Sequence, residues 1–285
     1  MPEWAELRIT SDFVNKTSVG KGFIKAEKSD VSKVKTDLSF MNMNRPFTIT
    51  AESRGKELRL SISDQKESKY LLMFMGMSGG FALISPKYKD YDKVMKHSHL
   101  RFYREDGMIL CFHDVRRFGK WKWADEWSNN RGFDPVRETE EWKNELRNSY
   151  KDNHGFVSEV LMNQKLFSGV GNYLRAEILC RTQDNPWKKL SEFNAEEIEN
   201  LMNVTLYCLE TAYLNQGGRI KDWQNPFIQN ENHATPMSNW ILCYGSLQSS
   251  MIKDKTGRTF WFDPIWNSEV PEKYLKKKHK LTEII

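Results

Sequence analysis

The sequence predicts an α+β fold in which a leading helix and a two-sheet antiparallel β-sandwich precede a helical domain that ends in a β-hairpin. Between about residues 20 and 123, short runs of alternating apolar and polar residues are separated by turn signals, a pattern typical of sandwiches. A polar stretch punctuated by Gly132 and Pro135 follows, and beyond it the apolar residues recur at helical spacing.

In the first half, Ala5, Ile9 and Phe13 recur every four residues and predict a helix over residues 5–14. Turn signals at 54–56 and 105–107 each join two strands into a hairpin. Strands are predicted at residues 46–53, 57–63, 69–75, 80–85, 100–103 and 108–112.

In the second half, helices are predicted at residues 138–150, 155–163, 171–181 and 195–215, the last opened by Asn194. Strand texture returns at 246–262, with a hairpin tip at 254–257. We therefore expect an N-terminal domain at 2–127, a hinge linker at 128–137 and a C-terminal domain at 138–285.

The composition is that of a soluble globular protein, with 39% hydrophobic and 28% charged residues. The sequence has no membrane-length apolar run and no signal-peptide pattern, so we expect an intracellular protein with no membrane partner. The net charge of +5 permits a polyanionic partner without requiring one. The four cysteines are far apart in sequence, which favours buried thiols over a disulfide framework or a zinc knuckle.

The chain begins Met1-Pro2-Glu3, and removal of Met1 would leave Pro2 with an N-terminal secondary amine. An α-amino group has a reference pKa about 2.5 units below that of lysine, so far more of it is neutral at pH 7. A secondary amine can condense with a sugar aldehyde to give a cationic iminium, which accepts electrons. Because many chains begin with Met-Pro, this feature needs support from elsewhere in the sequence.

That support comes from residues 164–179, which read Gln-Lys-Leu-Phe-Ser-Gly-Val-Gly-Asn-Tyr-Leu-Arg-Ala-Glu-Ile-Leu. Gly169 and Gly171 let the backbone approach a ligand closely, and Asn172 follows at the start of a predicted helix. Exposed amides at a helix N-terminus suit a phosphate group. The whole string resembles the helix-two-turns-helix motif of the formamidopyrimidine-DNA glycosylase and endonuclease VIII family, here at about 155–181.

The resemblance extends over most of residues 2–264. It implies catalytic roles for Pro2, Glu3 and Lys56, with Glu6 in support. The loops Gly76-Met-Ser-Gly-Gly-Phe81 and Asp114-Val-Arg-Arg-Phe-Gly119 are similar to the family's two loops that enter the DNA stack. The remaining residues that the resemblance marks are the void-filling Met77, Arg116 and Phe118 and the phosphate-binding His97, Gly171 and Asn172.

Residues 240–264 resemble the family's β-hairpin finger, with a catalytic arginine, Arg258, at its tip. Bacterial relatives hold this hairpin with four cysteines and zinc, whereas only Cys243 lies in this region. The pattern is similar to the zincless-finger branch of endonuclease VIII-like enzymes. We therefore expect no metal and no cofactor, and a finger held by strand pairing and by aromatics such as Trp240, Phe260 and Trp261.

The resemblance implies a bifunctional DNA glycosylase and abasic-site lyase of base excision repair, acting through a Schiff base on Pro2 with β,δ-elimination. The zincless branch implies oxidised pyrimidines and hydantoins as substrates. An 8-oxoguanine-type purine glycosylase and a non-catalytic damaged-DNA-binding protein are the alternatives. The expected partner is damaged DNA, duplex or single-stranded, bound by a monomer, in the nucleus if the host is eukaryotic and otherwise in the cytoplasm or nucleoid.

The chain departs from the family pattern directly after Glu3. Family members usually continue with Gly-Pro, and this chain has Trp4-Ala5. The Trp4 indole could pack beneath the pocket, or it could obstruct a bulky base.

Overall fold

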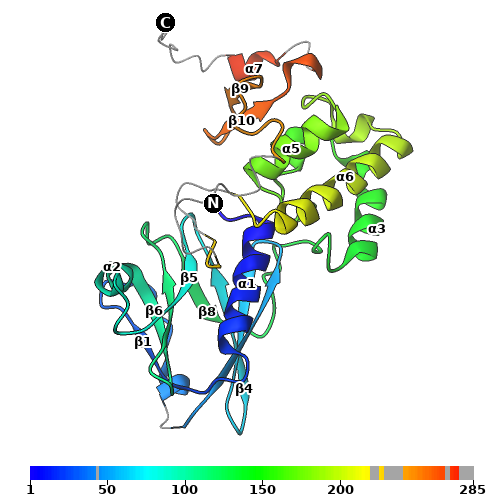
Figure 1. The fold of residues 1–285 in the computed structure, drawn as a ribbon. Coiled ribbons are helices and arrows are strands. Elements are labelled where there is room, and N and C mark those ends of the chain that lie inside the picture. The colour runs from blue at the N-terminus through cyan, green and yellow to red at the C-terminus, as the bar shows by residue number, and fades with distance from the viewer. Residues whose placement is uncertain (43–44, 219–224, 228–239, 267–269, 276–285) are drawn as a thin grey trace, which may run out of the picture. The chain divides into compact units, whose positions relative to one another are not determined.

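The computed structural model describes residues 1–42, 45–218, 225–227, 240–266 and 270–275 (Figure 1). The chain divides into two compact units, one comprising residues 1–131 and 212–238 and the other 132–211 and 239–285. Each unit is described by itself.

The first unit contains two four-stranded antiparallel sheets, which confirms the predicted sandwich class. One sheet has the strand order β1-β6-β7-β5, formed by Phe23–Lys28, Ser98–Arg104, Ile109–His113 and Gly80–Ile84. The other has the order β2-β3-β4-β8, formed by Thr48–Arg54, Glu57–Ser63, Ser68–Phe74 and Lys120–Trp123.

Helix α1 (Trp4–Ser18) packs against the sandwich and runs four residues beyond the predicted end. Its apolar side, including Leu7, Phe13 and Val14, joins the core of the unit. The Asn15 side chain fixes the helix to strand β2 by donating to the Ala51 carbonyl at 2.8 Å and accepting from the Ala51 amide at 2.7 Å. The strands bury large side chains into the same core, among them Phe23, Phe47, Ile49, Leu60, Leu71, Phe81, Phe102, Phe112 and Trp121.

All six predicted strands are present, with ends that differ by up to two residues. Strands β1 and β8 and helix α2 (Tyr91–His97) were not predicted individually. In strand β1 only Phe23 and Ala26 are buried, and three of its six residues are charged. Strand β8 has only four residues. Helix α2 has no fully buried residue, although Tyr91, Val94 and Met95 are partly buried against strands β5 and β7. It has only seven residues, too few for an apolar period to be recognised.

The second unit contains helices and a two-stranded antiparallel hairpin of β9 and β10. The end of α6 counts with the first unit. The helices and strands of the second unit are α3 (Thr139–Ser149), α4 (Val157–Val160), α5 (Asn172–Thr182), α6 (Ala195–Leu214), β9 (Ser250–Lys253), β10 (Thr259–Phe262) and α7 (Glu272–Leu275). Short 3₁₀ segments occur in the two units at Ser39–Asn42, Tyr150–Asp152, Leu190–Glu192 and Pro264–Trp266.

The predicted helix at 155–163 was wrong in length, because α4 has only four residues. Beyond it, the amides of Met162 and Asn163 bond to carbonyls three residues earlier, at 3.1 and 2.8 Å. Such bonds form tight turns instead of further α-helix. The predicted start of α6 is confirmed: Asn194 Oδ1 accepts from the Glu197 amide at 2.9 Å, and Glu197 Oε2 accepts from the Asn194 amide at 2.8 Å.

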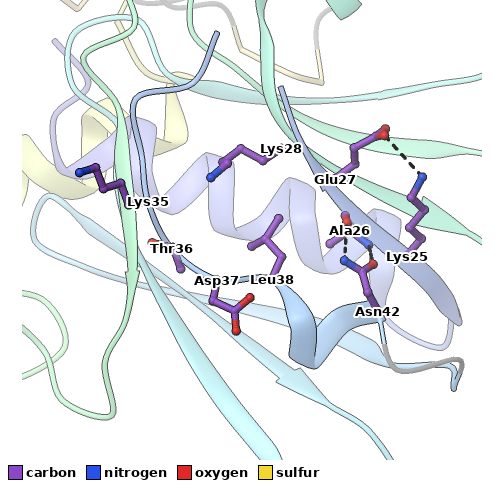
Figure 2. A pocket seen from close by; sticks show the side chains of 9 residues that line it. All are labelled: Lys25, Ala26, Glu27, Lys28, Lys35, Thr36, Asp37, Leu38 and Asn42. Carbon is purple, nitrogen blue, oxygen red and sulfur yellow. Dashed lines mark hydrogen bonds and ion pairs between the residues drawn. The ribbon is translucent and has the colours of Figure 1, made fainter. Parts of the chain in front are cut away.

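A surface pocket of about 550 Å³ lies beside β1 (Figure 2). Its polar groups bond to the surrounding chain: Asn42 pairs with both backbone groups of Ala26 at 3.0 Å, and Lys28 Nζ donates to the Val34 carbonyl at 2.9 Å. None of the predicted site residues lines it; the lining consists of Lys25, Ala26, Glu27, Lys28, Lys35, Thr36, Asp37, Leu38 and Asn42. Among the helices described, none is long and apolar enough to cross a membrane.

Candidate active site and nucleic-acid interface

The N-terminal segment is held by the buried Glu6 carboxylate. Glu3 is the N-cap of α1, and its side chain accepts from the Glu6 amide while Glu6 Oε2 accepts from the Glu3 amide at 2.6 Å. The second oxygen, Glu6 Oε1, accepts from the Gly218 amide at 2.6 Å. Gly217 lies at φ +76°, and a Cβ there would stand 2.9 Å from the same oxygen. Glu6 therefore joins the start of α1 to residues 217–218.

Pro2 and Glu3 are both buried next to this network. A buried carboxylate is stable only when its oxygens accept hydrogen bonds or face a cation, and the backbone amides meet that need for Glu6. The segment that carries Pro2 is consequently fixed at the first turn of α1. The two carboxylates there accept hydrogen bonds from backbone amides that have no partner within the helix.

Trp4, the residue that departs from the family pattern, packs edge-on against Tyr213 with ring centroids 6.4 Å apart. Its side chain is 6% exposed. The Tyr213 hydroxyl donates to Asp12 Oδ2 at 2.7 Å, and the Arg8 guanidinium lies 6.0 Å from the Tyr213 ring centre. Trp4, Arg8 and Asp12 follow each other at intervals of four residues along α1, so one side of the helix holds Tyr213.

Lys56 lies in the turn between β2 and β3, as predicted. Gly55, directly before it, has φ +56°, a backbone conformation that favours glycine. The Lys56 side chain is half-buried. The following residue, Glu57, is buried and accepts from the Ser128 amide at 3.2 Å while lying 3.6 Å from Arg131 Nε.

The two predicted void-filling loops contact each other. Gly76 has φ +60°, and a Cβ there would lie 2.8 Å from the Phe118 carbonyl carbon, so the loop of Met77 runs directly against the loop of Phe118. The Arg116 guanidinium lies 5.1 Å from the Phe118 ring centre, and the Phe118 side chain is 53% exposed. The structure therefore brings together the loops that carry the three predicted void-filling residues.

Buried Asp114 organises both loops. Its Oδ1 accepts from the Ser78 hydroxyl and, at 3.2 Å, from the Arg116 amide, and its Oδ2 accepts from the Gly119 amide at 2.6 Å. Ser78 Oγ also accepts from the Arg116 amide at 3.1 Å. Each loop is thus bonded to the same carboxylate.

His97 ends helix α2, and its carbonyl accepts from the Asp114 amide at 2.9 Å. Two further histidines lie nearby: His99 Nε2 is 3.0 Å from the Asp114 carbonyl, and His113 precedes Asp114. Burial lowers the pKa of His99 and lowers that of His113 to about 4. The predicted phosphate ligand His97 therefore lies beside two histidines that favour the neutral form.

In the second unit, the predicted phosphate loop is braced by Gln164. Its side-chain amide donates to the Val170 carbonyl at 2.8 Å and accepts from the Gly169 amide at 3.2 Å. Gly169 has φ +94°, a backbone conformation that favours glycine. Gly171 is the N-cap of α5, with φ −127° and ψ −154°. The expected turn therefore leads directly into a helix N-terminus.

Asn172, the first residue of α5, is bonded on both sides of its amide. Its Nδ2 donates to the Thr259 carbonyl at 2.8 Å, and its Oδ1 accepts from Arg175 Nη2. An amide nitrogen carries two N–H donors, so donation to Thr259 uses one of them. Asn172 thus links the predicted phosphate loop to strand β10.

The Asp254 side chain, as well as its backbone, stabilises the turn of the finger hairpin. Asp254 Oδ1 accepts from the amides of Thr256 and Arg258 at 2.9 and 3.0 Å, and Oδ2 accepts from Arg175 Nη1 at 3.2 Å. Burial raises the pKa of Asp254, but these hydrogen bonds and the Arg175 charge outweigh it and lower the pKa overall. Gly257 has φ +79°, and the Arg258 side chain is exposed at the tip, as predicted.

The base of the finger is held by a second buried carboxylate, Glu177. Its oxygens accept from three consecutive amides, those of Leu242, Cys243 and Tyr244, at 2.9, 2.9 and 2.8 Å. Arg181 pairs with Glu177 and donates to the Trp240 carbonyl at 2.6 Å. These contacts fix the chain that leads into β9.

Aromatic packing accounts for the rest of the finger. The Trp187 ring lies 5.8 Å from Phe260 and from Phe262, and the Tyr244 ring lies 6.4 Å from Trp261. The Arg181 guanidinium lies 4.6 Å from the Trp240 ring centre. Within the described residues no group of His, Cys, Asp or Glu has a metal-binding arrangement. The expectation of a metal-free finger stays a prediction.

Sequence reasoning missed the buried charged residues Asp114, Arg175, Glu177 and Asp254. The signal for two of them was available, because Arg175 and Glu177 interrupt an otherwise apolar helix over Tyr173–Leu179, and charges in such positions are seldom buried unless paired. Each has a partner on its own helix, Asn172 for Arg175 and Arg181 for Glu177, but the contacts that join the helix to the finger reach 65 or more residues along the sequence. No local pattern identifies contacts at that separation.

The two-sheet sandwich, the predicted phosphate loop at a helix N-terminus and the hairpin finger are together typical of a DNA-glycosylase fold. Residues 1–121 match the formamidopyrimidine-DNA glycosylase N-terminal domain. The chain is 34% identical to human Endonuclease 8-like 1 and 33% identical to the mouse protein, in both cases over 100% of this chain and 78% of the relative.

A solved structure of the Lactococcus lactis Fpg protein with DNA containing Fapy-dG has the same fold, with a TM-score of 0.77 and 22% identity over 94% of this chain and 100% of that one. The chain belongs to the formamidopyrimidine-DNA glycosylase and endonuclease VIII family, a family of DNA-repair enzymes.

Proposed function

We propose that this protein is a bifunctional DNA glycosylase and abasic-site lyase that removes oxidised bases, with the secondary amine of Pro2 as its nucleophile. The observation that carries the proposal is the fixed, buried N-terminal segment: Pro2 directly precedes a capping box in which Glu3 and Glu6 bond reciprocally. A nucleophile is useful only if it is held in place against the reacting carbon.

In the proposed reaction, the nitrogen of Pro2, exposed after loss of Met1, attacks the anomeric carbon while the bond from that carbon to the damaged base breaks. The base leaves with the electrons of that bond and takes up a proton from water. Glu3 accepts the proton that the Pro2 nitrogen loses and passes it to the sugar ring oxygen, the bond from the anomeric carbon to that oxygen breaks, and the nitrogen and carbon form a cationic iminium. A carboxylate has about four lone-pair sites, so Glu3 can cap the helix and still reach the substrate. Lys56 stabilises negative charge on sugar or phosphate oxygens.

The iminium then withdraws electrons from the neighbouring carbon, which loses a proton, and the 3′ phosphate leaves with the electrons of its bond to the sugar. A second elimination releases the 5′ phosphate in the same way. Glu6 does not contact the sugar in this scheme. It holds the first turn of α1 and the amide of Gly218.

DNA recognition is proposed to combine phosphate contacts with base flipping. Asn172 and Gly171 begin helix α5, whose N-terminal amides suit a phosphate, and His97 and Arg258 contribute in addition. Turning a base out of the duplex costs a few kcal/mol. Met77, Arg116 and Phe118 fill the resulting gap, and the joined loops described above support such a role.

The proposed substrates are oxidised pyrimidines and hydantoins, with 8-oxoguanine as the alternative. The loop over residues 227–239, on which this choice depends, lies almost wholly outside the described residues. A panel of duplex and single-stranded oligonucleotides, each with one lesion and measured at one salt concentration, separates these possibilities. The protein is further proposed to act as a monomer inside the cell, in the nucleus of a eukaryotic host.

Borohydride trapping tests the central proposal. The reductant converts an enzyme–DNA iminium into a stable covalent adduct, so wild-type protein incubated with an abasic-site duplex should become attached to the DNA. The Pro2→Gly variant should lose most of the adduct, and Pro86→Gly, at an exposed turn, should retain it. Complete absence of a wild-type adduct would favour a DNA-binding protein without catalysis. Retention of Met1 in the active protein would exclude Pro2.

A further inference from the structure

The contacts around Arg175 form a closed ring that joins two DNA-contacting parts of the second unit. Arg175 Nη2 donates to Asn172 Oδ1, and Arg175 Nη1 donates to Asp254 Oδ2 at 3.2 Å. Asp254 Oδ1 accepts from the Arg258 amide at 3.0 Å, and Thr259, the next residue, accepts from Asn172 Nδ2 at 2.8 Å. Each member is therefore bonded to the members on both sides of it.

Arg175 is also fixed from outside this ring. Its side chain is 2% exposed, its guanidinium carbon lies 4.3 Å from the centre of the Phe260 ring, and Nη1 lies 3.4 Å from the Ser158 carbonyl. A guanidinium is planar and donates in a fixed fork. It therefore sets the angle between its acceptors, which a flexible ammonium group would not do.

The ring has a direct consequence for Arg258. The tip of the finger is a short loop, and both backbone groups of Arg258 are held by Asp254: the amide by Oδ1 at 3.0 Å, and the carbonyl by the Asp254 amide at 2.9 Å. The orientation of Asp254 thus fixes the position of the Arg258 backbone, from which the exposed side chain extends. That orientation is set in turn by Arg175, on the helix that begins with Asn172.

We propose that Arg175 and Asp254 are positioning residues that hold the phosphate-contacting Asn172 and the finger residue Arg258 in one fixed geometry. This inference rests on the proposed function, because it assigns the consequence of the ring to base removal. Neither residue needs to touch the DNA. They contribute to base removal by holding Arg258 and Asn172 in place. Arg175, a side chain of α5, makes the finger rigid through Asp254.

The experiment compares Asp254→Asn and Arg175→Lys with a stability control outside the ring, Ile198→Val, at a buried position in α6. Asp254→Asn keeps an oxygen acceptor but removes the charge that faces Arg175. Arg175→Lys keeps the charge but removes the planar fork. Single-turnover excision of 5-hydroxyuracil from a duplex is measured at saturating enzyme, and cleavage of a preformed abasic-site duplex is measured beside it.

Both ring variants should slow excision roughly ten-fold to a hundred-fold, as misplacement of a positioned group does, with a much smaller effect on abasic-site cleavage. In an Arg258→Ala background the Asp254→Asn change should add little, because residues that act as one unit are not additive. Equal losses on both substrates that follow the melting temperature, as in Ile198→Val, would overturn the inference. So would full additivity with Arg258→Ala.

A measurement without substrate separates this inference from the proposed function. Hydrogen exchange of the finger peptide, residues 250–262, should accelerate in Arg175→Lys and Asp254→Asn but not in Ile198→Val. Unchanged exchange would overturn the inference even if the enzyme is active. Wild-type protein that gives no borohydride adduct would refute the proposed catalysis, while faster exchange in the ring variants would still support the positioning of Arg258 by Arg175.

Discussion

At the scale of single residues, the first turn of α1 shows how this chain accommodates a bulky side chain where its family usually has glycine. Trp4 is almost fully buried against Tyr213, and Tyr213 is held by Asp12, about two turns further along the same side of the helix. The indole is therefore used for packing close to Pro2, the proposed nucleophile. The hydrogen bond to Asp12 raises the pKa of Tyr213, with burial acting in the same direction.

We predict that Trp4→Ala lowers the free energy of unfolding by about 3 kcal/mol, because a large buried ring is lost. Tyr213→Phe should cost about 1 kcal/mol through the lost hydrogen bond. In a cycle of Trp4→Ala and Tyr213→Ala, the coupling energy should be about 0.5–1.5 kcal/mol. Urea unfolding of the four proteins measures this, and strict additivity would contradict the packing role.

A second prediction at this scale concerns acid stability. Burial lowers the pKa of His113 to about 4 from its ordinary value of 6.5, so on acidification the unfolded chain binds a proton before the folded one does. The stabilising effect of keeping His113 neutral is complete above pH 6.5 and is lost as the pH falls toward 4, by roughly 3 kcal/mol. The charges that face His113 are those of Asp114, His97 and His99.

His113→Gln should remove this part of the pH dependence, and His154→Gln, at an exposed position, should leave it unchanged. Unfolding free energies measured between pH 4 and pH 8 provide the test. A pH profile of His113→Gln identical to that of the wild-type protein would contradict the prediction.

At the scale of elements, the two predicted void-filling loops are joined because Asp114 bonds to both and Gly76 allows their close approach. We predict that Gly76→Ala moves the loops apart and slows base excision more than it slows abasic-site cleavage. The unfavourable φ and the clash with Phe118 should together cost about 2–3 kcal/mol.

Gly107→Ala is the matched control for this change. Gly107 also has positive φ, at +82°, but a Cβ there would meet nothing within 4 Å. It should cost only about 1 kcal/mol and leave excision unchanged. Similar excision rates for the two variants would show that contact between the loops does not matter for catalysis.

The elements also show what a sequence can predict. Strand β3 and the start of α6 were predicted to the residue, because alternation and an Asn cap are local signals. Helix α2 was not predicted, because its seven residues are too few to show an apolar period. The site residues from Pro2 to Arg258 came from a resemblance to known motifs. The buried partners Asp114, Glu177 and Asp254 did not, since their bonds join distant segments.

At the scale of the whole molecule, the net charge of +5 is modest for a protein that binds a polyanion. Binding must therefore depend on where the cations lie more than on their sum. Two lysines are engaged at the pocket beside β1, which none of the predicted site residues lines. Lys28 donates to the Val34 carbonyl at 2.9 Å, and Lys25 lies 3.4 Å from Glu27 (Figure 2). The predicted contacts Arg258 and His97 lie in different compact units.

This distribution yields a prediction for the intact protein. The logarithm of the affinity for an undamaged duplex should fall linearly with the logarithm of salt concentration, since each phosphate contact releases counterions. Arg258→Ala should lower the slope by about one contact, roughly 0.9, whereas Lys25→Met should leave it unchanged, because Lys25 lies at the pocket and not among the predicted contacts. Fluorescence anisotropy at five salt concentrations between 50 and 250 mM, in roughly equal logarithmic steps, resolves such a difference. An equal change of slope in both variants would mean that the finger arginine adds only general charge.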